Sequence, residues 1–151
     1  MKILKSLSLL LALSLLIAGC SDYGKKVTKG PIEVYYKEGV TPEQARHTAE
    51  LFAYIDSAQN NNSKDTKSMQ LCKTNGIFCF RMVSEKDKLA GVDDRSFYVI
   101  GNLVSDSIFN GSPVNVELTN NTFETFKTFA YKKMDLNNLD TPQQTPVQPA
   151  Q

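Results

Sequence analysis

The order in which two spacings of apolar residues follow one another constrains the fold more than any other feature of this sequence. Apolar residues at every second position are typical of a strand buried on one face, and spacings of three and four are typical of an amphipathic helix. Ile32, Val34 and Tyr36 alternate, and the spacing is helical from Ala45 to Ile55. The later patterns predict a hairpin over residues 67–84, a helix over 94–108 and a strand over 114–118.

This order predicts an α+β domain of β-α-β-β-α-β topology, built as a two-layer sandwich in which an antiparallel sheet carries both helices on one face. The phenylalanines from Phe123 to Phe129 repeat every third residue, a spacing that fits neither a regular strand nor a regular helix. We favour an irregular extra C-terminal strand over residues 122–131 that covers a sheet edge. Residues 132–151 are rich in Pro and Gln and are predicted to be disordered, which leaves the domain to residues 31–131.

Capping residues mark the ends of both predicted helices. Residues 41–44, Thr-Pro-Glu-Gln, form a capping box with proline at the first helical position. Asp93 and Asp94 are candidate caps for the second helix, and Asn110-Gly111 predicts its end. Gly101 lies inside this second helix, where glycine costs about 1 kcal/mol relative to alanine. We therefore expect Gly101 to permit close packing of the helix on the sheet.

The turn signal Asn75-Gly76 fixes the expected register of the hairpin. A turn centred there places Leu71 opposite Phe80 and Cys72 opposite Cys79, with the two cysteines on the face away from the apolar residues. We hypothesise a cross-strand disulfide between them, which an oxidising compartment outside the cytoplasm would permit; two free thiols are the alternative. A tight two-residue loop would put the pair at a hydrogen-bonded position of the ladder, and a four-residue loop would put it at a non-hydrogen-bonded position. Opposed side chains are farther apart at the hydrogen-bonded positions. A redox role is disfavoured because the spacing is C-x6-C and not C-x-x-C.

The N-terminus has the parts of a secretory signal in their usual order. Lys2 and Lys5 are followed by an apolar stretch that is too short to span a bilayer as a stable helix, and by the small residues Ala18 and Gly19. The run Leu-Ile-Ala-Gly-Cys that ends at Cys20 resembles the lipobox of secreted bacterial lipoproteins.

This resemblance implies that a signal peptidase removes residues 1–19 and that Cys20 carries acyl chains such as palmitate. Two or more chains hold a protein stably on a membrane. Ser21 resembles the sorting signal that favours the outer over the inner membrane. Residues 20–30 are polar and are predicted to be a tether between the lipidated Cys20 and the domain.

Five short motifs are spread over the predicted domain: Glu33–Lys37, Gly39–Thr41, Met69–Leu71, Phe80–Val83 and Ile108–Val114. Together they loosely resemble the motifs of an uncharacterised bacterial envelope domain, over roughly residues 32–118. No activity is associated with that domain, so the resemblance implies one shared fold and no site. The Cys pair departs from the pattern of that domain.

Side chains suited to catalysis or metal binding are sparse. His47 is the only histidine, and no Cys or carboxylate cluster has ligand spacing around it. Asp93 and Asp94 are explained more simply as caps than as paired acids, and the serines lack a G-x-S-x-G context. We therefore expect that the protein is not an enzyme and that it binds no cofactor and no metal. The net charge of +1 predicts no attraction for nucleic acid.

The sequence thus predicts a lipid-anchored bacterial envelope protein of the periplasmic space. Its domain is expected to be a non-catalytic binding or structural module that contacts another envelope protein. The alternative is a carrier of a small ligand or lipid, with a pocket between the helices and the sheet, which the many Phe and Met residues suggest.

Overall fold

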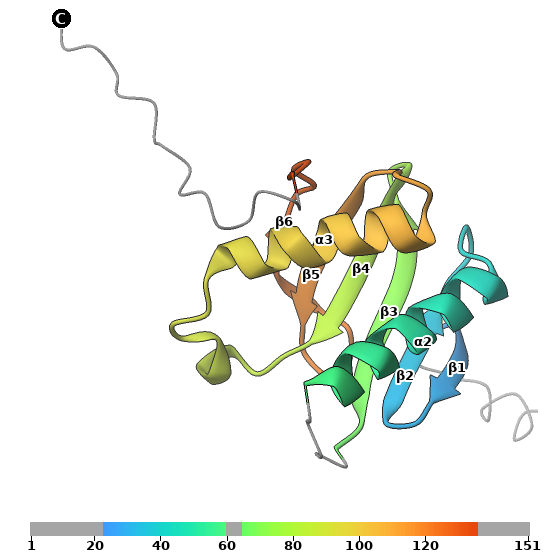
Figure 1. Cartoon of the computed structure of the whole chain (residues 1–151), viewed down its shortest axis with the longest axis horizontal. Helices are drawn as coiled ribbons and strands as arrows, with labels where there is room; N and C mark the ends of the chain where they lie inside the picture. The colour runs from blue at the N-terminus through green and yellow to red at the C-terminus, as the bar shows by residue number, and fades with distance from the viewer. Residues whose placement is uncertain (1–22, 60–64, 136–151) are drawn as a thin grey trace, which may run out of the picture.

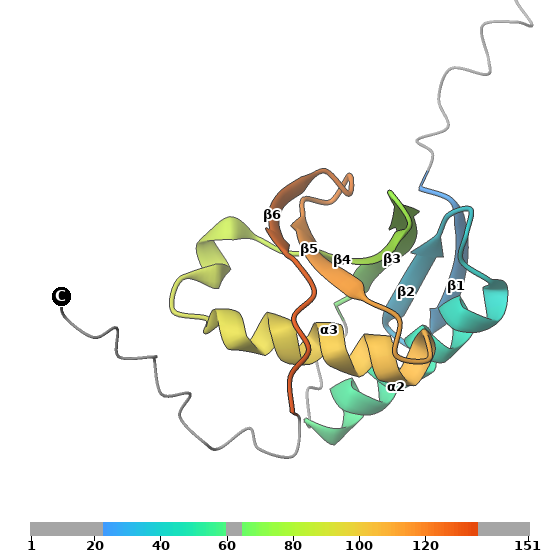
Figure 2. The ribbon, with the colours of Figure 1, turned by 90° about the horizontal axis from the view of Figure 1, so that it is seen from above.

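The computed structural model describes residues 23–59 and 65–135, which form one sheet covered on one side by two helices (Figures 1 and 2). Strands β1 to β6 lie in the sheet in the order of the chain. Helix α2 packs on β1 and β2, and helix α3 packs on β5. The elements are β1 (Lys25–Lys29), β2 (Ile32–Tyr36), α2 (Pro42–Ala58), β3 (Lys67–Thr74), β4 (Ile77–Val83), the 3-10 helix η2 (Lys86–Leu89), α3 (Asp94–Ile108), β5 (Val114–Thr119) and β6 (Thr125–Phe129).

The sheet is mixed, so the expected antiparallel sheet is wrong at two of its pairings. The predicted order β-α-β-β-α-β is present as β2-α2-β3-β4-α3-β5. However, β2 pairs parallel with β3, and β4 pairs parallel with β5. The reason is that each helix returns the chain to the end of the sheet where the preceding strand began, so the next strand runs in the same direction. The pairs joined by short turns, β1–β2, β3–β4 and β5–β6, are antiparallel.

The sheet begins earlier than the sequence suggested. Lys25–Lys29, expected to be part of a tether, forms edge strand β1 and pairs with β2. Val27 is its only apolar residue and packs against the core, while the four neighbouring positions are polar. Lysines on an edge strand discourage pairing with another chain. Because β1 has a single apolar residue, it shows no alternation of apolar residues in the sequence.

The C-terminal strand agrees with the sequence prediction, whereas the start of the tail differs from it. The extra strand is confirmed as β6, and its pairing with β5 is irregular at Leu118 and Thr119. Beyond it, the Asn102 side chain on α3 donates to the Lys132 carbonyl and accepts from the Met134 amide. The first residues of the predicted tail are therefore hydrogen-bonded to the domain, and residues 136–151 lie outside the described part of the chain.

The predicted caps are confirmed at both helices. Thr41 accepts from the Gln44 amide at 3.1 Å, and the Gln44 side chain accepts from the Thr41 amide at 2.9 Å. Asp93 is the N-cap of α3 and accepts from the Arg95 amide. Asn110 and Gly111 both have positive φ and follow the end of α3, as the stop signal predicts.

Aromatic pairs fill much of the space between the helices and the sheet. Phe52 of α2 stacks on Phe80 of β4, with ring centroids 5.0 Å apart. Phe97 of α3 stacks on Phe129 of β6 at 4.5 Å. Phe80 is fully buried, which confirms its expected place in the core.

Gly101 lies where α3 packs closely on β5 of the sheet. A Cβ at this position would lie 3.2 Å from a methyl carbon of Val116 and 3.4 Å from the Val114 carbonyl oxygen. The expected role of Gly101 in close packing is therefore confirmed, because even a single methyl group there would require the Val116 side chain to shift.

We predict that Gly101→Val lowers the free energy of unfolding by about 1–3 kcal/mol, since extra carbons forced into a packed interface cost this much. Urea denaturation monitored by circular dichroism measures the change. Ser107→Val places the same residue on an exposed position of α3 and controls for helix propensity. Equal losses in the two variants would contradict a packing role for Gly101.

Candidate functional site

A row of polar side chains crosses the face of the sheet that lies away from the helices. We call it the polar face and define it by Gln70, Cys72, Cys79, Arg81 and Glu117. The register places Gln70 opposite Arg81, and Arg81 opposite Glu117, on three neighbouring strands. Because strands alternate their side chains, all of these residues point to the side opposite the apolar core.

Hydrogen bonds link this row into one network. The Arg81 guanidinium donates to a Glu117 carboxylate oxygen at 2.7 Å and to the Gln70 side-chain oxygen at 3.0 Å. The Thr125 hydroxyl of β6 donates to the same Glu117 oxygen at 2.8 Å. Each buried side-chain N or O atom of the described residues has a hydrogen-bond partner. The network therefore ties β3, β4, β5 and β6 together across the sheet.

The ion pair sets the charge state of Glu117. Burial by itself would raise the pKa of this carboxyl, but the hydrogen bonds from Arg81 and Thr125 outweigh burial and hold the pKa below its ordinary value of 4.5. Glu117 is therefore ionised at neutral pH, and the Arg81 guanidinium is its counter-charge.

The two cysteines lie directly opposite one another on β3 and β4, as the hairpin register predicts. Both are buried free thiols in the structure. The pKa of Cys72 is lowered to about 7, mainly by a hydrogen bond from Cys79 and also by the charge of Arg81, which together outweigh the opposite effect of burial. The same hydrogen bond raises the pKa of Cys79.

The turn between these strands is the tight form. Asn75 and Gly76 both have positive φ, with φ of 51° and 82°, and β3 and β4 extend to Thr74 and from Ile77. Such a two-residue turn puts Cys72 and Cys79 at a hydrogen-bonded pair of the ladder, where Cα atoms are about 5.5 Å apart. That separation is within the usual range for a disulfide.

The first described residue, Tyr23, is fixed to the polar face. Its carbonyl oxygen accepts a hydrogen bond from the Gln70 side chain at 2.9 Å. Its ring packs edge-on against Tyr35 of β2 and against Phe123 of the β5–β6 loop, with centroids 5.9 and 5.4 Å away. The next residue, Gly24, has φ of +86°, and a Cβ there would lie 2.2 Å from the Tyr36 carbonyl oxygen. Only glycine permits this path of the chain onto the sheet.

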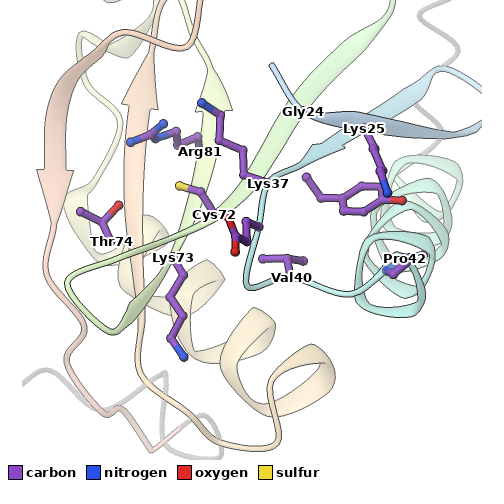
Figure 3. A pocket seen from close by; sticks show the side chains of 11 residues that line it. Gly24, Lys25, Lys37, Val40, Pro42, Cys72, Lys73, Thr74 and Arg81 are labelled. Carbon is purple, nitrogen blue, oxygen red and sulfur yellow. The ribbon is translucent and has the colours of Figure 1, made fainter. Parts of the chain in front are cut away.

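An open hollow of about 1190 Å³ lies beside this entry point, where β2 ends and the β3–β4 hairpin continues. It does not lie between the helices and the sheet, where the carrier hypothesis places a pocket. Figure 3 shows the side chains of Lys37 and Arg81 on the same side as the Cys72 thiol, while Lys73 points away from them. The lining residues are Gly24, Lys25, Tyr36, Lys37, Glu38, Val40, Pro42, Cys72, Lys73, Thr74 and Arg81.

The residues with classical catalytic side chains are dispersed. His47 is half exposed on α2 and pairs with Glu43 at 2.9 Å, and Asp93 caps α3. Within residues 23–59 and 65–135, no group of three or more His, Cys, Asp or Glu side chains is placed to hold a metal ion. The same part of the chain contains no helix that is long and apolar enough to cross a membrane. Cys20 and the predicted signal peptide lie outside the described residues.

Sequence reasoning found the Cys pair but missed the network beside it. The hairpin register already places Gln70 opposite Arg81, so that pair was available from the sequence. Glu117 was not, because its position beside Arg81 depends on the parallel pairing of β4 with β5. The contact of Tyr23 with Phe123 joins two distant segments and leaves no local pattern in the sequence.

Comparison with known proteins gives one kind of evidence, a family assignment. The chain matches AF_1994_N, described as a family N-terminal domain, over residues 26–130. No curated protein and no solved structure matches it. The matched range begins within β1 and ends just after β6, so it coincides with the sheet and its two helices. Because this range is more than half of the 151 residues, the chain belongs to the AF_1994_N family.

Proposed function

We propose that this protein is a lipid-anchored component of the bacterial cell envelope, held through acyl chains on Cys20, and that its domain is a non-catalytic binding or structural module. The partner is another envelope protein, and the outer membrane is favoured because of Ser21. The observation that supports the proposal is the position of Tyr23, which is bound to the sheet three residues after Cys20. A folded domain that begins directly after the lipobox is the arrangement expected of an anchored module.

Chain length sets how close the domain lies to the lipid. Consecutive Cα atoms are at most about 3.6 Å apart along an extended chain, so Cys20 lies within about 11 Å of Tyr23. The longer tether expected from the sequence would have let the domain move freely above the surface. The fixed position of Tyr23 instead favours one orientation, with the end of the sheet that contains Gly24 toward the membrane.

We also propose that Cys72 and Cys79 form a disulfide in the envelope. Their opposed positions support it, as does the lowered pKa of Cys72, because the thiolate is the form that attacks a disulfide of an external oxidant. In that exchange the two thiols lose two electrons and two protons, and the oxidant's disulfide becomes two thiols. The loop closed is short, so the stabilisation is at most about 3 kcal/mol.

Intact mass of the protein extracted from native membranes tests both modifications. We expect a mass that exceeds the polypeptide 20–151 by acyl increments and that rises by two hydrogens on reduction. Cys20→Ser is expected to move the protein from the membrane fraction to the soluble fraction, since the acyl chains are its anchor. Cys72→Ser should stay in the membrane fraction and lose only the response to reduction.

Each result has its own consequence. An unmodified mass that starts at another residue would overturn the lipid anchor. Two free thiols in the unreduced protein would overturn the disulfide alone. Crosslinking in intact cells then addresses the partner, and a crosslinked membrane that enriches no second envelope protein would count against the binding module.

A further inference from the structure

The two cysteines of the hairpin differ in their access to the open hollow. Cys72 is one of its lining residues and Cys79 is not. Cys79 is 1% exposed, and its thiol donates to the Ile77 carbonyl oxygen at 3.7 Å. Cys72 is also covered, at 4% exposed, but Figure 3 shows its sulfur on the side of the hollow where Arg81 lies. The hollow is therefore the route by which a small molecule reaches Cys72 before Cys79.

The groups around the pair also distinguish the two thiols. The hydrogen bond from Cys79 and the charge of Arg81 lower the pKa of Cys72 to about 7, against the opposite effects of burial and of Glu117. The hydrogen bond with Cys72, burial and the charge of the Cys72 thiolate raise the pKa of Cys79. A large fraction of Cys72 is therefore thiolate at neutral pH, and the thiolate is the nucleophile in disulfide exchange.

Access and position together assign a role to each cysteine. We propose that Cys72 is the entry thiol and Cys79 the resolving thiol of a two-step exchange with a small organic disulfide that reaches Cys72 through the hollow. The inference rests on the proposed disulfide of this pair, for which it gives the order of attack and the class of oxidant.

The exchange balances in both steps. The Cys72 thiolate first attacks one sulfur of the small disulfide, so that a mixed disulfide forms on Cys72 and the other half leaves as a thiolate that takes a proton from water. The Cys79 sulfur then attacks the Cys72 sulfur, and the second half leaves with the Cys79 proton. The pair has lost two electrons and two protons, and the reagent has become two thiols.

The first step prepares the second. Once Cys72 is a neutral mixed disulfide, it no longer holds the Cys79 proton through its hydrogen bond and its negative charge, which are two of the causes that raise the pKa of Cys79. The register keeps Cys79 directly opposite Cys72, with Cα atoms about 5.5 Å apart at such a pair. The leaving thiol departs through the hollow by which the reagent entered.

Single-cysteine variants of the unacylated chain test the two roles. The chain 20–151 with Cys20→Ser contains every described residue and keeps only Cys72 and Cys79 as cysteines. The reduced protein is mixed with glutathione disulfide at pH 7, quenched in acid at set times and analysed by intact mass. We expect Cys79→Ser to accumulate one glutathione per chain. Cys72→Ser should react at least about tenfold more slowly, because its remaining thiol is covered and largely protonated.

Two comparisons link the difference to the fold and to the hollow. In concentrated urea the two single-cysteine variants should react at equal rates, because unfolding exposes both thiols. Thr74 lines the hollow and lies two positions after Cys72, on the same face of β3. In the Cys79→Ser chain, Thr74→Phe should slow the reaction more than Thr74→Val, since phenylalanine narrows the hollow whereas valine only removes the hydroxyl.

Several results would overturn the inference. Equal rates for Cys72→Ser and Cys79→Ser under native conditions would mean that the fold selects no entry thiol. Equal rates for Thr74→Phe and Thr74→Val would exclude the hollow as the route. Should a single-cysteine variant lose the native circular dichroism spectrum, the earliest adduct of the two-cysteine chain is mapped by peptide mass, and an adduct on Cys79 would overturn the assignment.

The native mass separates this inference from the proposed disulfide. Two free thiols in the protein from membranes, together with an adduct confined to Cys72 in the purified chain, would overturn the envelope disulfide and support the order of attack. A native disulfide together with equal reactivity of the two thiols would do the reverse.

Discussion

Replacing Arg81 by methionine is expected to lower the free energy of unfolding by about 3–5 kcal/mol, because breaking a buried ion pair leaves an uncompensated charge. The carboxylate left behind is Glu117, whose side chain is only 11% exposed. Gln70 loses its guanidinium donor at the same time. Methionine preserves most of the length and apolar volume of the arginine stem, so the loss reports the charge and its hydrogen bonds. Urea denaturation at neutral pH measures it.

A second substitution separates charge from packing. Adding Glu117→Gln to Arg81→Met removes the unpaired charge and should recover a large part of the lost stability, since replacing both partners of a buried pair costs far less than removing one. Two single losses that simply add in the double variant would show that Arg81 and Glu117 act independently, contrary to their 2.7 Å contact.

The same pair predicts a pH dependence. The folded-state pKa of Glu117 lies below the ordinary value of 4.5, so the folded state binds fewer protons than the unfolded state in this range. The stability from Glu117 is therefore present above pH 4.5 and is lost as the pH falls through the folded-state pKa. Arg81→Met removes the counter-charge, so the difference in stability between this variant and the unsubstituted protein should narrow in acid.

Phe80→Ala is expected to cost about 3–5 kcal/mol, the range for truncating a buried aromatic side chain in a core. Phe80 is 0% exposed and stacks on Phe52, with 19° between the ring planes. The truncation therefore opens a cavity between the centre of the sheet and α2. Thermal or urea unfolding of the purified domain gives the change in free energy.

An aromatic truncation on the surface provides the control. Tyr54 lies on the same helix as Phe52 and is 72% exposed, so Tyr54→Ala should change stability by no more than about 0.5 kcal/mol. The double variant of Phe52 and Phe80 should lose less than the sum of the single losses, since one cavity is then shared. A loss from Phe80→Ala as small as that from Tyr54→Ala would contradict its central place in the core.

The sequence alone predicted those features that depend on residues near one another in the chain. The box at Thr41 and Gln44 and the cap at Asp93 are contacts across a few residues, so their pattern is visible directly. The turn Asn75-Gly76 fixed the pairing of Cys72 with Cys79 because a tight hairpin has a single register. The two spacings of apolar residues gave the order of strands and helices for the same local reason.

Only the tertiary structure decided which strands are neighbours and what lies between them. The parallel pairing of β4 with β5 brings Glu117 to Arg81, and nothing near either residue in the sequence specifies that pairing. Strand β1 forms because its backbone hydrogen-bonds to the edge of β2, although most residues of β1 are charged. The contact of Tyr23 with Phe123 joins segments about 100 residues apart, and the hollow beside Lys25 joins the start of β1 to the β3–β4 hairpin. The local spacing of apolar residues determines the helices and strands. Their arrangement, and with it the candidate site, is determined when the apolar faces of the sheet and the helices are buried against one another.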